Sequence, residues 1–296
     1  PRAKGSKKKY VIIPNPFYQC YLAASIAANA QPIFVSACKD TNYLPNFDAI
    51  PKNILEKTGI FFICSPSNPH GTTADFDYWK NLINLSEKYN FRIFSDECYS
   101  EIYRHTKPLG IISVAESMGA DLEKISVFQS LSKRSNLPGL RSGFSINGKI
   151  STQILKKVRA YGGAPLATPF QIASERIWLD ENHVKLNRME YNKKFEVAGH
   201  IFKDYHNFKI PGAGFFICLA VDNPVIFTKE LWQKTGVKVL PGPYLCNSEN
   251  LSVSETQKVS SFVRIALVEQ EDKVKDGLYK IKNFLLKNTK FVPGSH

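Results

Sequence analysis

The sequence has little of what metal centres, redox pairs and membrane spans are built from. Its six cysteines are scattered singly among 296 residues, and none forms a Cys-x-x-Cys pair, so neither a zinc site nor a dithiol motif is predicted. No apolar run approaches the roughly 18 residues that a membrane helix needs. The first nine residues are basic and lack the apolar core of a secretory signal. We therefore expect a soluble, cytoplasmic protein with buried free thiols, no metal and no membrane partner.

Acidic residues are scarce relative to basic ones. There are 26 Asp and Glu against 39 Lys and Arg, which gives a net charge of +13. Such a surface can bind the phosphates of nucleic acids. However, only Lys7, Lys8 and Lys9 form a tight run, and the other lysines are dispersed at the spacing of helix surfaces. We interpret the charge as a solvated basic surface and predict no nucleic-acid partner.

Short apolar, β-branched or aromatic runs recur along the first half of the chain and alternate with helical patterns. In 75–89 apolar residues recur on one helical face, and Thr73 or Asp75 is placed to cap that helix. Strands that alternate with helices predict an α/β fold of three layers, in which a mostly parallel sheet is flanked by helices. The predicted strands are Tyr10–Ile13, Ile33–Val35, Ile60–Cys64, Phe91–Phe94, Ile125–Phe128 and Arg141–Ile146.

A smaller C-terminal α+β domain is predicted after a helical stretch that begins beyond Ser151. The long helical pattern 183–204 separates the two regions, and we place the boundary near Tyr191, which gives domains 1–190 and 191–296. The elements expected after residue 150 are helices at Ile154–Ala160, Pro169–Trp178, His183–Asp204, Val225–Lys234 and Lys273–Leu286, with strands at Phe215–Val221 and Val237–Leu240.

Polar residues follow three of the predicted strands, at the edge of a parallel sheet where ligands bind. Each has an ordinary alternative: Asp96 could cap a helix, Lys133 could be a surface lysine, and Asn68 is common in turns. Their joint occurrence in a fixed order nevertheless predicts a site. Its members are Asn68, then Asp96 and Tyr99, then Ser130, Ser132 and Lys133, followed by Arg141.

This order resembles the class I/II, fold-type I aminotransferases that depend on pyridoxal phosphate. The shared motifs are Asn-Pro-x-Gly, Asp-x-x-Tyr, and Ser-x-Ser-Lys with an arginine eight residues beyond the lysine. The resemblance is closest to the succinyldiaminopimelate transaminase branch and runs from about Tyr10 to the last helix. It is carried by Asn15–Gln19, Ser95–Tyr103 and Ser130–Gly139.

The resemblance implies a role for each residue of the site. Lys133 would hold the cofactor as a Schiff base and then move a proton between the substrate Cα and the cofactor. Asp96 would keep the pyridine nitrogen protonated, so that the ring acts as an electron sink. Tyr99 and Asn68 would hydrogen-bond the ring oxygen. Ser130, Ser132 and Arg141 would hold the phosphate.

Two further residues are assigned by the same resemblance. Tyr18 matches the position whose ring stacks on the cofactor, although a core aromatic is the alternative. Arg264 matches the arginine that grips the substrate α-carboxylate, although a structural ion pair is the alternative. Gly212–Phe215 matches the loop that enters the sheet of the small domain, where glycine permits close backbone approach.

The sequence departs from the family pattern in two places. His70 stands where the family usually has threonine. Family members also carry, before the region that matches Tyr10, an arm, the first part of the small domain and a Gly-Ser/Thr-Arg turn at a helix N-terminus that binds the phosphate. Gly5-Ser6-Lys7 is too close to the first strand to replace that turn. We expect an N-terminally truncated chain with weakened cofactor retention.

The predicted activity is transamination of an amino acid with 2-oxoglutarate. The expected amino donor is N-succinyl-LL-2,6-diaminopimelate, an intermediate of lysine biosynthesis. The expected assembly is a homodimer. An aspartate- or aromatic-type aminotransferase, or a truncated non-catalytic relative, are alternatives. A serine enzyme of the penicillin-recognising kind is a further alternative, because Ser130–Lys133 satisfies Ser-x-x-Lys and Lys234–Gly236 supplies Lys-Thr-Gly. The Ser-Asp pair at 95–96 comes before that lysine rather than after it, which disfavours the serine enzyme.

Overall fold

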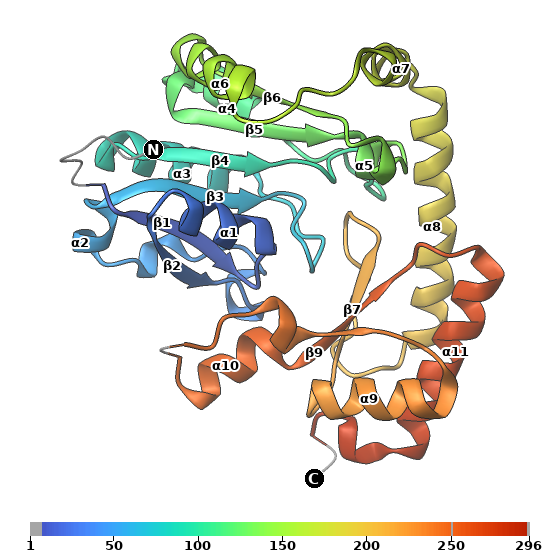
Figure 1. Cartoon of the computed structure of the whole chain (residues 1–296). Coiled ribbons are helices and arrows are strands. Elements are labelled where there is room, and N and C mark those ends of the chain that lie inside the picture. The colour runs from blue at the N-terminus through green and yellow to red at the C-terminus, as the bar shows by residue number, and fades with distance from the viewer. Residues whose placement is uncertain (1–7, 250, 295–296) are drawn as a thin grey trace.

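The computed structural model describes residues 8–249 and 251–294, so Gly5–Lys7 and the charge of Lys7 lie outside the described residues. A six-stranded sheet in the order β2-β1-β3-β4-β5-β6 forms the first part of the molecule (Figure 1). All neighbouring strands are parallel except β5 and β6, which are antiparallel. The strands are β1 (Tyr10–Asn15), β2 (Gln31–Ser36), β3 (Thr58–Cys64), β4 (Arg92–Asp96), β5 (Ile125–Ser130) and β6 (Gly143–Asn147).

Helices cover both faces of this sheet, and the predicted three-layer α/β fold is confirmed. On one face α3 and α4 bury Trp79, Leu82 and Val114 against the strands. On the other face α1 packs Tyr21 against Phe62. The helices of this part are α1 (Gln19–Ala27), α2 (Lys52–Leu55), α3 (Phe76–Tyr89), α4 (Ile111–Met118), α5 (Leu131–Arg134), α6 (Lys149–Tyr161) and α7 (Thr168–Leu179).

The N-cap, the apolar face and the C-terminal residue of helix α3 explain where it forms and ends. The Asp75 carboxylate accepts a hydrogen bond from the backbone N–H of Tyr78 at 2.8 Å, so Asp75 rather than Thr73 is the N-cap. Its buried face comprises Trp79, Leu82, Ile83 and Ser86. At the other end Asn90 takes the left-handed conformation with φ of 52°, which terminates the helix.

A second, three-stranded antiparallel sheet in the order β7-β9-β8 lies below the first in Figure 1. The long helix α8 (Asn182–Phe202) runs along one side of the molecule and joins the two parts. Its C-terminal half packs with α9 and α11 over the second sheet to form a separate apolar core. The remaining elements are β7 (Phe216–Ala220), α9 (Pro224–Thr235), β8 (Leu240–Pro241), α10 (Val253–Ser260), β9 (Phe262–Ala266) and α11 (Glu271–Lys287).

Two predicted strand boundaries are wrong. The strand expected at 237–240 is reduced to β8, because Gly236 with φ of 75° ends α9 and only Leu240 and Pro241 pair with β9. The strand expected from Arg141 begins instead at Gly143. Arg141 has φ of 56°, which is incompatible with an extended strand.

Backbone and side-chain contacts hold the two sheets against each other at the carboxyl ends of the parallel strands. Asn15, at the end of β1, donates from Nδ2 to the Asn247 carbonyl at 2.8 Å and accepts from the Asn247 N–H at 3.0 Å. On the opposite side Gly214 donates its N–H to the Ile102 carbonyl at 2.7 Å. The ends of β1, β3, β4 and β5 therefore face the second sheet. Within the described part of the chain, no helix is both long enough and apolar enough to cross a membrane.

Candidate active site

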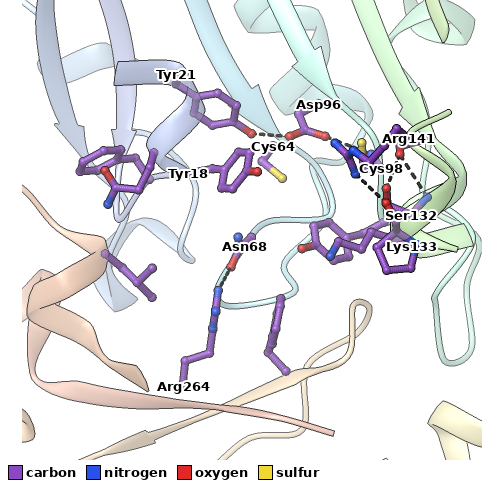
Figure 2. A pocket seen from close by; sticks show the side chains of 17 residues that line it. Tyr18, Tyr21, Cys64, Asn68, Asp96, Cys98, Ser132, Lys133, Arg141 and Arg264 are labelled. Atoms are coloured by element: carbon purple, nitrogen blue, oxygen red, sulfur yellow. Dashed lines mark hydrogen bonds between the residues drawn. The ribbon is translucent and has the colours of Figure 1, made fainter. Parts of the chain in front are cut away.

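A cavity of about 410 Å³ opens where the strand ends of the large sheet meet the small sheet (Figure 2). Its wall contains all nine residues that the sequence predicts for the site. They come from segments that lie far apart along the chain and converge only in the folded protein. They are Tyr18, Asn68, Asp96, Tyr99, Ser130, Ser132, Lys133, Arg141 and Arg264.

The carboxylate of Asp96 is held at the floor of the cavity by two donors. Its Oδ2 accepts a hydrogen bond from the Tyr21 hydroxyl at 2.6 Å, and its Oδ1 accepts one from the Cys98 N–H at 3.2 Å (Figure 2). The neighbouring Glu97 has a different function. Its Oε1 accepts from the Ile111 N–H at 3.1 Å and thereby supports the start of α4. Only the first of these two adjacent acids lines the cavity.

Lys133 extends from the short helix α5 and is half-buried. Its Nζ lies 5.2 Å from the ring centroid of Phe215, and no hydrogen bond or ion pair engages it within residues 8–249 and 251–294. Burial lowers the pKa of this amine from 10.5, and the nearby cation Arg264 lowers it further, although Cys98 and Asp96 oppose that effect. A lowered pKa increases the neutral, nucleophilic fraction of the amine.

Beside Lys133, two serines and an arginine form a polar corner. The Ser130 hydroxyl donates to Ser132 Oγ at 2.9 Å, and Ser130 Oγ accepts from the Ser132 N–H at 3.1 Å. Arg141 donates from Nη1 to the Pro138 carbonyl at 2.7 Å, which leaves the rest of its exposed guanidinium available. Two hydroxyls and a guanidinium together suit a phosphate group.

On the opposite wall, Arg264 from β9 contacts Asn68 from the loop after β3. Its Nη1 donates to Asn68 Oδ1 at 2.8 Å, and its guanidinium lies 4.2 Å from the ring centroid of Phe216 (Figure 2). Because the amide oxygen of Asn68 is engaged, its Nδ2 remains as a donor. Tyr99 is buried, and burial raises the pKa of its phenol, so that its hydroxyl also remains a donor.

Tyr18 lies at the mouth of the cavity, where the chain enters α1. It precedes the first helical residue, and its side chain is 53% exposed. Its ring meets that of Tyr21 edge to face, with centroids 5.8 Å apart. The Tyr18 ring therefore contacts Tyr21 but is about half exposed, and the core-aromatic alternative for Tyr18 is wrong.

His70 packs between the two parts of the molecule instead of lining the cavity. Its ring stacks on Tyr43 with centroids 4.1 Å apart and meets Phe262 of β9 at 5.0 Å. Burial lowers the pKa of His70 to about 3, so the ring is neutral at physiological pH. The substitution of histidine for threonine is accommodated by aromatic packing.

The cavity also contains residues that the sequence analysis did not select. Tyr21 could have been found from its spacing, because it lies one helical turn after Tyr18 and so shares its face. Four others lie within the stretches that carry the family resemblance, at positions 17, 19, 98 and 138, and the remaining three approach only through the fold. The additional lining residues are Phe17, Gln19, Tyr21, Cys64, Cys98, Pro138, Phe216 and Leu245.

The charges of the cavity fit an anionic ligand that carries a reactive carbonyl. Among the described lining residues, Lys133, Arg141 and Arg264 are cationic and Asp96 alone is acidic. No group of three or more His, Cys, Asp or Glu side chains that could hold a metal occurs within the described ranges. At the strand ends of this α/β sheet, a lysine amine, two hydroxyls with a guanidinium, and one carboxylate line a single cavity, an arrangement that suits an enzyme of covalent carbonyl chemistry.

The chain belongs to the aminotransferase class I and II family, whose model matches residues 1–278. Members of this family are pyridoxal-phosphate-dependent transferases, and the family prediction made from the motifs is confirmed.

Individual relatives agree with this assignment. The chain is 28% identical over 288 residues to the LL-diaminopimelate aminotransferase of Natranaerobius thermophilus, and the match covers 91% of this chain and 68% of that relative. It is 37% identical to an aminotransferase of Neisseria meningitidis of known structure, with a TM-score of 0.87 over 93% of this chain and 70% of that chain. A Thermus thermophilus structure described as a probable N-succinyldiaminopimelate aminotransferase shares the fold, with 20% identity, a TM-score of 0.82, and coverage of 94% and 72%.

Proposed function

We propose that this chain binds pyridoxal phosphate in the cavity between its two sheets and transfers an amino group from an amino acid to a 2-oxo acid. The observation that carries the proposal is the convergence of all nine motif residues on one cavity of about 410 Å³. A chance match of motifs would leave these side chains scattered over the surface.

The residues present fit the cofactor in charge and in chemistry. Ser130, Ser132 and Arg141 would hold its phosphate, and the half-exposed ring of Tyr18 would cover its ring. The Asp96 carboxylate would pair with the pyridine nitrogen, and Asn68 Nδ2 would donate to the ring oxygen. Each of these groups has a donor or acceptor that the described contacts leave available or hold toward the cavity.

When bound, pyridoxal phosphate supplies an electron sink that stabilises negative charge at the substrate Cα. The protein contributes binding and proton transfer. Lys133 Nζ would hold the cofactor through its carbonyl carbon and, once displaced by the substrate amine, would take the proton from Cα. Arg264 would orient the α-carboxylate, and its contact with Asn68 would fix the distance between substrate and cofactor sites.

We propose a diaminopimelate-type amino donor, N-succinyl-LL-2,6-diaminopimelate, with 2-oxoglutarate as the acceptor. The motif resemblance to the succinyldiaminopimelate branch and the relatives named LL-diaminopimelate aminotransferase support this choice. An aspartate- or aromatic-type activity is the second candidate, since it requires the same cofactor site and the same α-carboxylate arginine. A cytoplasmic location suits all of these small-molecule substrates.

The test is a half-reaction panel. The protein is loaded with pyridoxal phosphate and mixed in turn with N-succinyl-LL-diaminopimelate, LL-diaminopimelate, aspartate and phenylalanine, and the loss of the visible absorbance band is followed in time. We expect the succinylated donor to react fastest. Faster reaction with aspartate or phenylalanine would overturn the substrate assignment. A loaded protein that reacts with none of the donors would favour the non-catalytic alternative.

A further inference from the structure

Tyr21 is a buried tyrosine whose hydroxyl points at the Asp96 carboxylate rather than at water. Its side chain is 5% exposed, and its ring stacks on Phe62 with centroids 4.7 Å apart and planes inclined by 12°. From this position the hydroxyl donates to Asp96 Oδ2 at 2.6 Å, a length typical of a hydrogen bond from a hydroxyl to a carboxylate (Figure 2). Helix α1 on one side and the sheet on the other therefore fix the phenol.

The direction of this hydrogen bond follows from the ionisation of the phenol. Burial is the main cause that raises the pKa of Tyr21 well above 10, and the neighbouring Cys64 and Asp96 raise it further. The phenol consequently keeps its proton over the whole physiological range. A protonated phenol next to a carboxylate acts as the donor, so the Tyr21 hydroxyl donates to Asp96 Oδ2.

The other groups around Asp96 are weaker donors or contact the other oxygen. The Cys98 N–H engages Oδ1 at 3.2 Å, and the buried thiols of Cys64 and Cys98, whose pKa values burial raises, stay neutral and are weaker donors than a hydroxyl. Lys133 has the opposite charge, but no hydrogen bond joins it to Asp96 within the described residues. Without the Tyr21 hydroxyl, Oδ2 would lose its only described donor inside a largely apolar surrounding.

We propose that Tyr21 is a positioning residue that holds the Asp96 carboxylate in a fixed orientation toward the cavity. This inference rests on the proposed function, because the carboxylate so held is the one assigned to the pyridine nitrogen. Although Tyr21 also lines the cavity, its hydroxyl is directed to Asp96. It acts through Asp96, and helix α1 couples it to Tyr18, which begins the same helical turn at the cavity mouth.

The decisive variant is Tyr21→Phe, which keeps the ring and its stacking on Phe62 and removes the hydroxyl. The matched control is Tyr78→Phe, because the Tyr78 hydroxyl also donates one hydrogen bond, to the Pro45 carbonyl at 2.8 Å, but lies outside the cavity wall. We expect Tyr21→Phe to bind pyridoxal phosphate roughly ten- to a hundredfold more weakly, the range of one hydrogen bond to a charged group. Its visible absorbance band should also shift, and Tyr78→Phe should leave both unchanged. Affinity and spectrum equal to those of the unmodified protein would overturn the proposal.

A second measurement needs no cofactor. Tyr21→Phe and Asp96→Asn are combined in a double-mutant cycle, and urea unfolding of the cofactor-free proteins is compared. The proposal requires the effect of Tyr21→Phe to be several-fold smaller in the Asp96→Asn background. Additive effects would overturn it. If the unmodified protein fails to bind pyridoxal phosphate, the proposed function falls, whereas the cycle still decides whether Tyr21 holds Asp96.

Discussion

At the scale of single residues, the adjacent acids Asp96 and Glu97 show how local contacts assign different roles to chemically similar side chains. Asp96 receives a side-chain donor from Tyr21 and faces the cavity. Glu97 is buried on the other side of the chain, where the Ser95 hydroxyl and the Ile111 N–H donate to it. One acid therefore belongs to the binding site and the other to the framework.

A prediction about pH follows from Glu97. Burial raises the pKa of this carboxyl above 4.5, so the folded protein retains a proton that the unfolded chain has already lost. Glu97 therefore reduces stability as the pH rises from about 4.5 through the folded pKa. Glu97→Gln should reduce the fall in stability over this pH range. Glu97→Ala should lower the free energy of unfolding by about 1–3 kcal/mol, because the Ile111 N–H loses its acceptor.

Urea unfolding at a series of pH values between 4 and 8 tests this prediction. Both variants should still bind pyridoxal phosphate with the affinity of the unmodified protein when they are folded. A Glu97→Gln profile as steep as that of the unmodified protein would show that Glu97 does not titrate in this range.

At the same scale, the sequence analysis selected residues that all line one cavity, but it did not predict the contacts that support them. Asn68, Asp96, Lys133 and Arg264 were selected because motifs specify them. The pairing of Arg264 with Asn68 could not be predicted from the sequence, because it joins residues 196 positions apart along the chain. Tyr21 was missed because a buried aromatic residue in a helix usually serves only the core.

At the scale of elements, the loop between β3 and α3 depends on a glycine. Gly71 has φ of 68°, and a Cβ at this position would lie 2.2 Å from the Ala213 carbonyl oxygen and 2.7 Å from Pro211 Cβ. The close approach locks the loop that carries Asn68 against the strand entry of the small sheet. The positive φ of residue 71 and its close approach to the Ala213 carbonyl both require glycine.

Gly71→Ala should therefore destabilise the protein by at least about 2 kcal/mol, because it adds a backbone clash to an unfavourable φ. Gly119→Ala is the matched control. Gly119 has a similar φ of 64° but nothing within 4 Å of a Cβ, so that only conformational strain of about 1 kcal/mol is expected. Chemical denaturation of both variants provides the comparison. Equal decreases in the free energy of unfolding of the two variants would show that the close approach to Ala213 does not affect stability.

Helices and strands with strong apolar periodicity were predictable from the sequence. Strands whose existence or bounds depend on pairing with a neighbouring strand were not. Five of the first-half strands and helix α3 follow from apolar runs and capping. Strand β9 was not predicted because its five residues carry a central arginine, Arg264, which interrupts the apolar pattern. For 237–240 the alternation of valines predicted a strand, but Val237 and Val239 pack on the second core without extended pairing.

At the scale of the whole molecule, we propose that residues 1–190 and 191–296 form two domains joined within α8. Separate apolar cores on either side of this helix support the division. The cavity lies between the two parts, with Asp96 and Lys133 on one side and Arg264 on the other (Figure 2). A hinge in this region would change the distance between the cofactor and carboxylate sites.

An exposed apolar face supports the proposal of a homodimer. On α6 the residues Ile150, Ile154 and Val158 recur at helical spacing and are each about half exposed or more, although such a stripe is normally buried. Exposed apolar residues also occur on β6, at the end of α6 and on α7. They are Phe144, Ile146, Tyr161, Phe170 and Ile172.

Val158→Glu should abolish dimer formation if this face is the interface. Val253→Glu is the control, since Val253 is also an exposed valine, at 77%, but begins α10 in the other part of the molecule. Sedimentation velocity should give a dimer for the unmodified protein and for Val253→Glu, and a monomer for Val158→Glu. A monomeric unmodified protein, or a dimeric Val158→Glu protein, would exclude this assembly.

The central claim is that Lys133 is the lysine that holds pyridoxal phosphate. It is tested most directly by adding the cofactor, reducing with borohydride, digesting the protein and locating the phosphopyridoxyl group by mass spectrometry. We predict modification of the peptide that contains Lys133, and its loss in Lys133→Ala but not in the surface control Lys149→Ala. Stoichiometric modification of a different lysine, or undiminished labelling of Lys133→Ala, would contradict the account.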